Sequence, residues 1–196
     1  MYHRVSRRPA LIALLAAILA TLYAVVPVGT ASAADPRLEQ AFALLAPLQD
    51  RDGIPYADVL EARQIGIMVG DLPPDLLAIY YEPRRRIIIA PSTLDQQDPT
   101  LVASLIAHEL QHAADRDLNN QGLAQLDCFE REARGFETQI RIWRTFWPDE
   151  LPTRTVAERD LAALTPAYER RGIDGIRELL VATPGYMKLC AGREAG

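Results

Sequence analysis

The spacing of apolar residues changes from helical to strand-like within the first half of the chain. From 35 to 64, apolar side chains recur at three- and four-residue intervals on both sides of an Asp52-Gly53 turn, which predicts a helix and then a short helix over 56–62. Three short apolar runs follow, with a turn before the last, and each has the length and residue types of a strand. These predicted strands cover 65–69, 76–81 and 86–90, and together they predict a small antiparallel sheet.

The segment after the strands predicts a long helix. Asp98 and Pro99 form a helix start signal, and no helix-breaking residue interrupts the apolar segment that follows, so a helix is predicted over 101–117. Residues 119–122 break it, and an amphipathic helix is predicted over 123–146. Because this second helix carries one continuous apolar stripe, we expect it to pack on the first.

The remainder of the chain predicts two further helices within 155–180, divided at Gly172, and then a tail from Pro184. Hydrophobic residues make up 49 % of the 196 positions and charged residues 24 %, which is the composition of an ordinary globular domain. The pattern therefore predicts an α+β fold that is mostly helical, with the small antiparallel sheet placed before the two packed helices.

The first 33 residues are distinct from this domain. They combine a positively charged start, a nearly continuous apolar run over 10–26 and small residues over 29–33, in the order typical of a secretory signal peptide. Cleavage fits equally well after Ala33 or Ala34. Because the apolar run approaches membrane-spanning length, an uncleaved N-terminal anchor is the alternative. We predict export, to the periplasm, cell envelope or medium, of a single domain over 34–196.

Removal of 1–33 makes the remaining chain more acidic. The segment contains three arginines and no acid, so the formal net charge changes from −5 to −8. A domain this acidic is not expected to bind nucleic acid or an anionic membrane. Membrane contact is expected only under the alternative of an uncleaved N-terminal anchor. The sequence does not indicate an oligomeric state.

The chain has two cysteines, Cys128 and Cys190. In an exported protein such a pair is most simply a disulfide, which would connect the C-terminal tail to the second of the two packed helices. Free thiols or metal ligands are the alternative, although the paired C-x₂-C spacing of structural zinc sites is absent from the sequence.

The long predicted helix contains the motif H-E-x-x-H at 108–112. His108 and His112 are four residues apart, so on a helix both imidazoles point from one face and can bind one metal ion. Glu109 lies one step round the helix, near enough to reach a water on that metal without being a ligand. Two imidazoles, an open coordination position and a carboxylate base are what a water-activating zinc site needs. His3, the only other histidine, lies in the predicted signal peptide.

A catalytic zinc site needs a third protein ligand, and no histidine remains to supply it. The helix predicted over 123–146 offers three acids, Glu130, Glu132 and Glu137. With these two motifs, the segment 65–147 resembles the gluzincins, zinc metallopeptidases in which a glutamate on a second helix completes H-E-x-x-H. It is most similar to the small minigluzincins, with a short sheet, the motif helix and the glutamate helix, and with a thermolysin-like short separation between the two motifs.

The resemblance implies Glu130 as the third ligand, because related enzymes often show that ligand as the first residue of E-x-x-A followed by a polar residue. The chain departs from them at Arg134, where many relatives carry Asp or Asn. Helical geometry alone does not choose, so Glu132, the next candidate, and Glu137 stay open. Glu130 with Arg134 and Glu137 with Arg141 are also spaced as ordinary surface ion pairs.

The resemblance also implies a mechanism. His108, His112 and Glu130 would hold Zn²⁺, and Glu109 would take a proton from the attacking water and return it to the leaving amine. The developing oxyanion is stabilised by the metal alone or by the metal with a donor. With no histidine left, the candidate donors are an arginine or one of four tyrosines: Tyr80, Tyr81, Tyr168 and Tyr186.

Two further assignments stay open. The strand over 86–90 would pair as an edge strand with an extended substrate, or it packs in the core. Asp115 would orient an imidazole, or it lies on the surface.

The resulting hypothesis is an exported zinc metalloendopeptidase that hydrolyses a peptide or protein substrate. One alternative is a non-catalytic, zinc-stabilised module of the cell envelope that binds a peptide or protein. Another is a helical binding module without a metal, stabilised by the disulfide. Glu109 favours catalysis, because a structural metal site has no need of a carboxylate at that position.

Overall fold

The computed structural model describes residues 35–74, 76–149 and 151–193. The chain divides between Ala33 and Ala34, and the predicted signal peptide over 1–33 lies outside the described residues. Within the described ranges, no helix is both long and apolar enough to cross a membrane. This part of the chain is mostly helical with one small sheet, so the predicted α+β class is confirmed.

The N-terminal half contains the predicted strands and both predicted helices. Its elements are α2 (Pro36–Leu45), α3 (Tyr56–Arg63), β1 (Gly66–Val69), β2 (Ala78–Tyr81), the 3-10 turn η1 (Glu82–Arg84), β3 (Arg86–Ile89) and α4 (Pro91–Gln96). The short α4 was not predicted, because six residues are too few to show a helical apolar period.

The sheet is mixed, with strand order β1-β3-β2. β2 pairs antiparallel with β3, but β1 pairs parallel with it, so the prediction of a wholly antiparallel sheet is wrong for β1. Of the two assignments left open for 86–90, the edge strand is wrong and core packing is confirmed, because β3 has a partner strand on each side. Its residues Ile87, Ile88 and Ile89 are all buried. A continuous apolar run of this kind is typical of a strand that is covered on both faces.

The C-terminal half is helical throughout. Its elements are α5 (Pro99–Asn120), α6 (Cys128–Phe146), α7 (Val156–Arg171), α8 (Ile173–Ala182) and α9 (Pro184–Arg193). Asp98 caps α5 as predicted, accepting a 2.9 Å hydrogen bond from the Thr100 N–H. α6 begins later than the predicted 123, because the Asp127 side chain accepts a 2.7 Å hydrogen bond from the Glu130 N–H and caps the helix there. The predicted tail forms α9.

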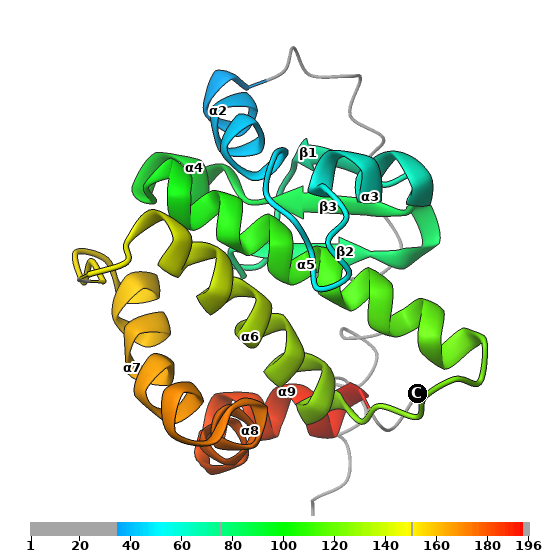
Figure 1. Ribbon diagram of the computed structural model, residues 1–196, viewed down its shortest axis with the longest axis vertical. Coiled ribbons are helices and arrows are strands. Elements are labelled where there is room, and N and C mark those ends of the chain that lie inside the picture. Colours follow the sequence, from blue (N-terminus) through cyan, green and yellow to red (C-terminus); the bar gives the residue numbers. More distant parts are fainter. Residues whose placement is uncertain (1–34, 75, 150, 194–196) are drawn as a thin grey trace, which may run out of the picture. The chain divides into compact units, whose positions relative to one another are not determined.

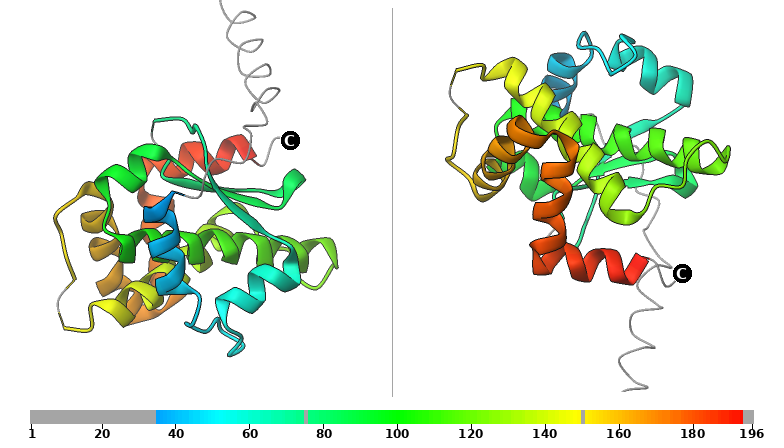
Figure 2. Two further views of the ribbon diagram at one scale, coloured as in Figure 1. Left: turned by 90° about the horizontal axis from the view of Figure 1, so that it is seen from above. Right: turned by 60° about the horizontal axis from the view of Figure 1, so that its bottom comes forward.

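α5 is the central helix of this domain (Figure 1). On one side it contacts α2, β2 and β3, and on the other it packs along α6. α7 and α8 pack against each other and against α6, and both lie apart from the sheet (Figure 2). One hydrophobic core lies between α5, α2 and the sheet. A second surrounds Trp143 of α6, with Ile176 and Leu180 of α8. α5 and α6 therefore form an interface with a packed core on either side.

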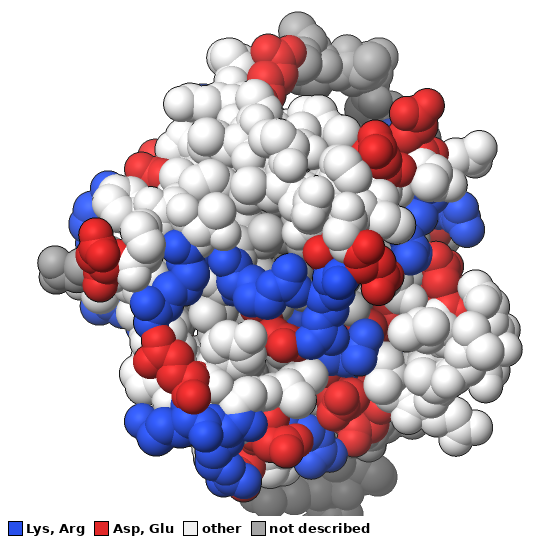
Figure 3. Space-filling view, viewed as in Figure 1, with Lys and Arg blue, Asp and Glu red and all other residues white. Residues whose placement is uncertain are grey.

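Acidic and basic side chains are interspersed on the face shown in Figure 3. Several ion pairs join the C-terminal helices. Arg144 of α6 pairs with Glu169 of α7, Arg171 of α7 with Glu178 of α8, and Arg177 of α8 with Asp127 at the start of α6. Exposed pairs of this kind stabilise a fold only weakly, so the two cores carry most of the packing energy.

Candidate metal centre

The two histidines of the motif lie together on α5. Their four-residue spacing brings Nε2 of His108 to 3.0 Å from Nε2 of His112. His108 and Glu109 are buried and His112 is half-buried. One ligand atom from each of the three residues lies within 4.8 Å of the other two. Imidazole nitrogens and carboxylate oxygens bind divalent metals, so this group could hold a metal ion.

A second acid approaches both imidazoles from α6, and it is Glu132. Its Oε2 lies 3.7 Å from Nε2 of His108, and its Oε1 lies 3.8 Å from Nε2 of His112. The residue is 6 % exposed. The prediction of Glu130 as the third ligand does not agree with this geometry, which places the second candidate beside the histidines.

The other two acids of α6 have different surroundings. Glu130 lies about 200° round the helix from Glu132, and its carboxylate is 3.9 Å from the guanidinium of Arg177 on α8. Glu137 is buried and pairs with Arg51, which lies in the loop before α3. Both acids therefore have structural partners away from α5.

The sheet holds the carboxylate of Glu109. The backbone N–H of Tyr80 donates a 2.7 Å hydrogen bond to Glu109 Oε2. Tyr80 belongs to β2, which is an edge strand of the sheet. β2 is therefore the strand whose edge contacts the centre. The strand predicted over 86–90, β3, lies next to it in the middle of the sheet.

Three residues of α6 fix the ring of His108. Gln139 places its Oε1 3.2 Å from Nδ1, which leaves Nε2 directed towards His112 and Glu132. Phe136 meets the imidazole edge to face, with ring centroids 4.8 Å apart. Gly135 lies directly against the ring, and a Cβ at this position would be 2.7 Å from Nε2. The ring therefore occupies space that any other residue at 135 would fill.

The electrostatic surroundings of His108 favour a positive charge on it. Burial lowers the pKa of this imidazole, but the nearby carboxylates of Glu132 and Glu109 outweigh burial and raise it. A metal cation at the same place would benefit from the same two carboxylates. Protons and a metal ion are therefore expected to compete for this nitrogen.

Asp115 is fully buried beside the motif and is not a surface residue. It accepts 2.8 Å hydrogen bonds from Gln111 Nε2 and from Arg134 Nε of α6. Thr138 completes the group by donating to Gln111 Oε1 at 3.1 Å. Burial raises the pKa of Asp115, while Arg134 and Gln111 oppose that effect. The network links Gln111, the second x position of the motif, to α6, and so holds the two helices in register.

Cys128 and Cys190 form a disulfide, as predicted, with Cα atoms 5.4 Å apart. The bond excludes both cysteines as metal ligands. It also joins α9 to the first residue of α6. A disulfide is compatible with an exported protein, because such bonds persist in oxidising compartments.

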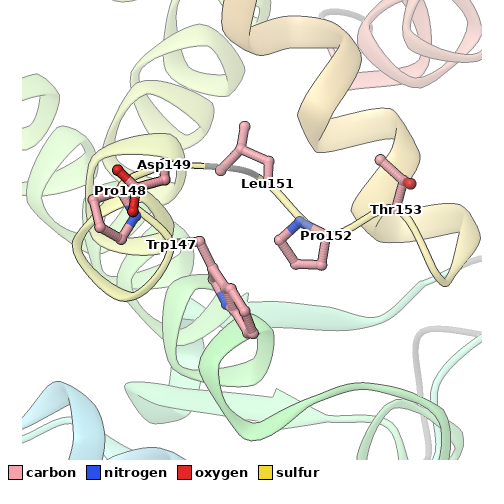
Figure 4. Close-up of a pocket in the computed structure, with 6 residues that line it drawn as sticks. All are labelled: Trp147, Pro148, Asp149, Leu151, Pro152 and Thr153. Atoms are coloured by element: carbon pink, nitrogen blue, oxygen red, sulfur yellow. The ribbon is translucent and has the colours of Figure 1, made fainter.

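Two pockets elsewhere on the domain do not include the metal-centre residues. One has a volume of about 390 Å³ and lies in the loop after α6, where Trp147, Pro148 and Pro152 form apolar walls (Figure 4). The other, of about 340 Å³, lies beside β1 and is lined by Arg84, Arg85 and Arg86. Neither contributes to the chemistry of the histidines.

Comparison of the chain with protein-family models, curated proteins and solved structures finds no match. The interpretation of the centre therefore rests on its own residues.

Sequence reasoning missed three features of the centre. Gly135 has a signal in the sequence, since a glycine inside an amphipathic helix costs about 1 kcal/mol relative to alanine and usually marks close packing. Gln139 follows Glu132 by seven residues, two helical turns along the same face. The Tyr80 N–H has no signal, because a backbone donor is present at every residue but proline.

Proposed function

We propose that this protein is an exported, zinc-dependent metallopeptidase of gluzincin type that hydrolyses peptide bonds in a peptide or protein substrate. The observation that carries the proposal is the approach of Glu132 to both His108 and His112, with Glu109 beside them as a separate carboxylate. The disulfide between Cys128 and Cys190 supports export.

The distances between the three donor groups suit zinc. Ligand bonds of about 2.0–2.1 Å in a tetrahedral arrangement place two ligand atoms about 3.4 Å apart. The separations here are 3.0 Å between the two Nε2 atoms and 3.7 and 3.8 Å from them to Glu132, on either side of that value. Two histidines and one glutamate are a ligand set of catalytic zinc sites, which keep a fourth position for water or substrate.

Each residue then has a defined task. Zinc held by His108, His112 and Glu132 would supply a Lewis acid that polarises the substrate carbonyl and lowers the pKa of water. Glu109 accepts a proton from the attacking water and returns it to the leaving amine. The Tyr80 N–H keeps the Glu109 carboxylate directed towards the centre. The outer edge of β2, which has no neighbouring strand among the described residues, offers its other backbone groups to an extended peptide.

Replacing Glu109 by glutamine tests the proposal. Glu109→Gln is expected to keep one zinc per chain and to lose about 10²–10⁴-fold in hydrolysis, because it removes a general base but no ligand. Zinc is measured by atomic emission and hydrolysis with fluorescently labelled casein. Glu61→Gln is the matched control, since Glu61 is exposed on α3, and it should behave as wild type.

Two results would contradict the proposal. Wild-type protein that holds one zinc but cleaves neither casein nor a random peptide mixture would favour the non-catalytic binding module. Wild-type protein that holds no zinc, even after reconstitution, would rule out both the metallopeptidase and the zinc-stabilised binding module.

A further inference from the structure

Over 184–191, the part of α9 whose side chains the structure describes, few residues attach the helix to the domain. Cys190 is fully buried in the disulfide, and Tyr186 and Leu189 are half-buried. Met187 and Lys188, between them, are exposed. A ten-residue helix is not stable by itself in water, so α9 depends on these three contacts for its position. Its contacts are with α8 and α6.

One of these contacts leads directly to the metal centre. The ring of Tyr186 meets that of Phe136 edge to face, with centroids 5.7 Å apart. Phe136 in turn meets His108 at 4.8 Å. Edge-to-face packing fixes the orientation of both rings. Tyr186 is thus one aromatic ring away from an imidazole of the site.

Two acids of the metal centre also act on the pKa of the Tyr186 phenol. Burial raises the pKa of Tyr186, and the carboxylates of Glu132, Asp160 and Glu109 raise it further. Two of these three acids flank the histidines. A phenol in these surroundings keeps its proton at neutral pH and is a hydrogen-bond donor.

The other tyrosines have different neighbours. Burial and the carboxylate of Glu137 raise the pKa of the Tyr168 phenol, and Arg141 and Arg51 oppose them. Burial raises the pKa of the Tyr80 phenol, and the charged groups that act on it are Arg85, Asp117, Glu82 and Arg63. Tyr80 packs against the first hydrophobic core. Tyr81 is the next residue of β2, so its side chain points to the opposite face of the sheet. Tyr186 is the one of these four tyrosines whose ring packs on Phe136 and whose phenol pKa is raised by acids of the centre.

We propose that Tyr186 is a catalytic residue of this centre, whose hydroxyl donates a hydrogen bond to the substrate carbonyl oxygen as negative charge develops on it, and that the Cys128–Cys190 disulfide is what positions it. The inference rests on the proposed function. The disulfide is well placed for this task, because Cys128 precedes Glu132 by four residues and lies on the same face of α6, one turn away. It therefore ties α9 to the turn that carries the third ligand.

Tyr186→Phe is the decisive variant, because it keeps the ring on Phe136 and removes only the hydroxyl. If the residue only packs, the variant should match wild type. If its hydroxyl stabilises the oxyanion, we expect zinc content and KM to be unchanged and kcat to fall by about 100-fold, the usual effect of losing one such donor. The assay uses a quenched fluorescent peptide built around the first bond that the wild type cleaves in casein. Met187→Ala, at an exposed position of the same helix, is the control.

The role of the disulfide is tested in the full-length double variant Cys128→Ser/Cys190→Ser. It should keep its zinc and lose kcat to the same extent as Tyr186→Phe. Combining all three substitutions should add little, because the disulfide acts through Tyr186. Full kcat in the double variant, or losses that multiply in the triple variant, would overturn the positioning role.

Failure of this inference is distinguishable from failure of the proposed function. A zinc-loaded wild type that cleaves the peptide, with a Tyr186→Phe variant of equal kcat, overturns the role of Tyr186 alone. A phosphinic peptide, whose tetrahedral oxygens imitate the developing oxyanion, gives a second readout by calorimetry, and its affinity should fall about 100-fold in Tyr186→Phe. A wild type that neither cleaves casein nor binds the phosphinic peptide overturns both.

Discussion

Glu132→Gln is expected to lose the bound zinc and, with it, all detectable hydrolysis. The variant removes the only charged ligand of the proposed set and leaves an amide 3.7–3.8 Å from the two imidazoles. Losing a partner that merely orients a ligand weakens metal binding by about 10–100-fold, so losing a ligand should cost more than about 100-fold. Zinc affinity is measured by titration calorimetry against a competing chelator.

Glu130→Gln is the matched control for this prediction. It makes the same chemical change two residues earlier on α6, at a carboxylate near Arg177. We expect it to keep its zinc and its activity. Thermal unfolding gives a second readout, because a ligand at 100 times its dissociation constant stabilises the native state by about 2.7 kcal/mol. Added zinc should therefore raise the Tm of Glu130→Gln but not that of Glu132→Gln. The reverse pattern would show that Glu130 is the ligand.

Gly135→Ala is expected to weaken zinc binding by more than tenfold although the residue is not a ligand. A methyl group at this position would lie 2.7 Å from Nε2 and 2.8 Å from Cε1 of His108, closer than packed atoms approach. Because Gln139 holds the ring on its other nitrogen, the imidazole cannot move without losing that hydrogen bond. The nitrogen that faces His112 and Glu132 is therefore displaced.

The stability of the zinc-free protein should respond much less to Gly135→Ala. Overpacking costs about 1–3 kcal/mol, but alanine gains about 1 kcal/mol over glycine within a helix, so the two effects partly offset each other. Gly185→Ala in α9 is the control, since no atom lies within 4 Å of a Cβ built there. Urea unfolding of the zinc-free proteins and zinc titration of each variant separate the two effects. Gly135→Ala with wild-type zinc affinity would contradict the packing argument.

The surroundings of Glu130 and Glu132 show how a sequence motif can favour a different acid from the one that packing brings near the histidines. The E-x-x-A resemblance favoured Glu130, but Glu132 lies nearer the apolar stripe of α6, about 60° away against about 100°. Once α6 packs that stripe on the rest of the domain, the nearer acid reaches α5. The capping of α6 by Asp127 leaves Glu130 in the first turn, beside Arg177.

The order of the strands shows a similar limit. The three apolar runs and the turn before the last predicted the strands and the β2–β3 pairing correctly, because a hairpin is a local structure. The parallel pairing of β1 with β3 is not local. The three consecutive isoleucines of β3 are compatible with a central strand, but by themselves they left the edge strand and core packing both open.

The sequence alone determined the longest helices of the described domain and its three strands. It also determined the disulfide partners and the placement of His108 and His112 on one helix face. All of these follow from caps, periodicity, composition or four-residue spacing, which act between neighbours along the chain. Only the tertiary structure decided that Glu132 approaches both imidazoles and that Gly135 and Gln139 confine His108. It also decided that α9 places the ring of Tyr186 against Phe136, which packs on His108. These contacts join separate helices, so they depend on how the side chains of one helix pack against those of another. The spacing of residues along the chain does not contain that information.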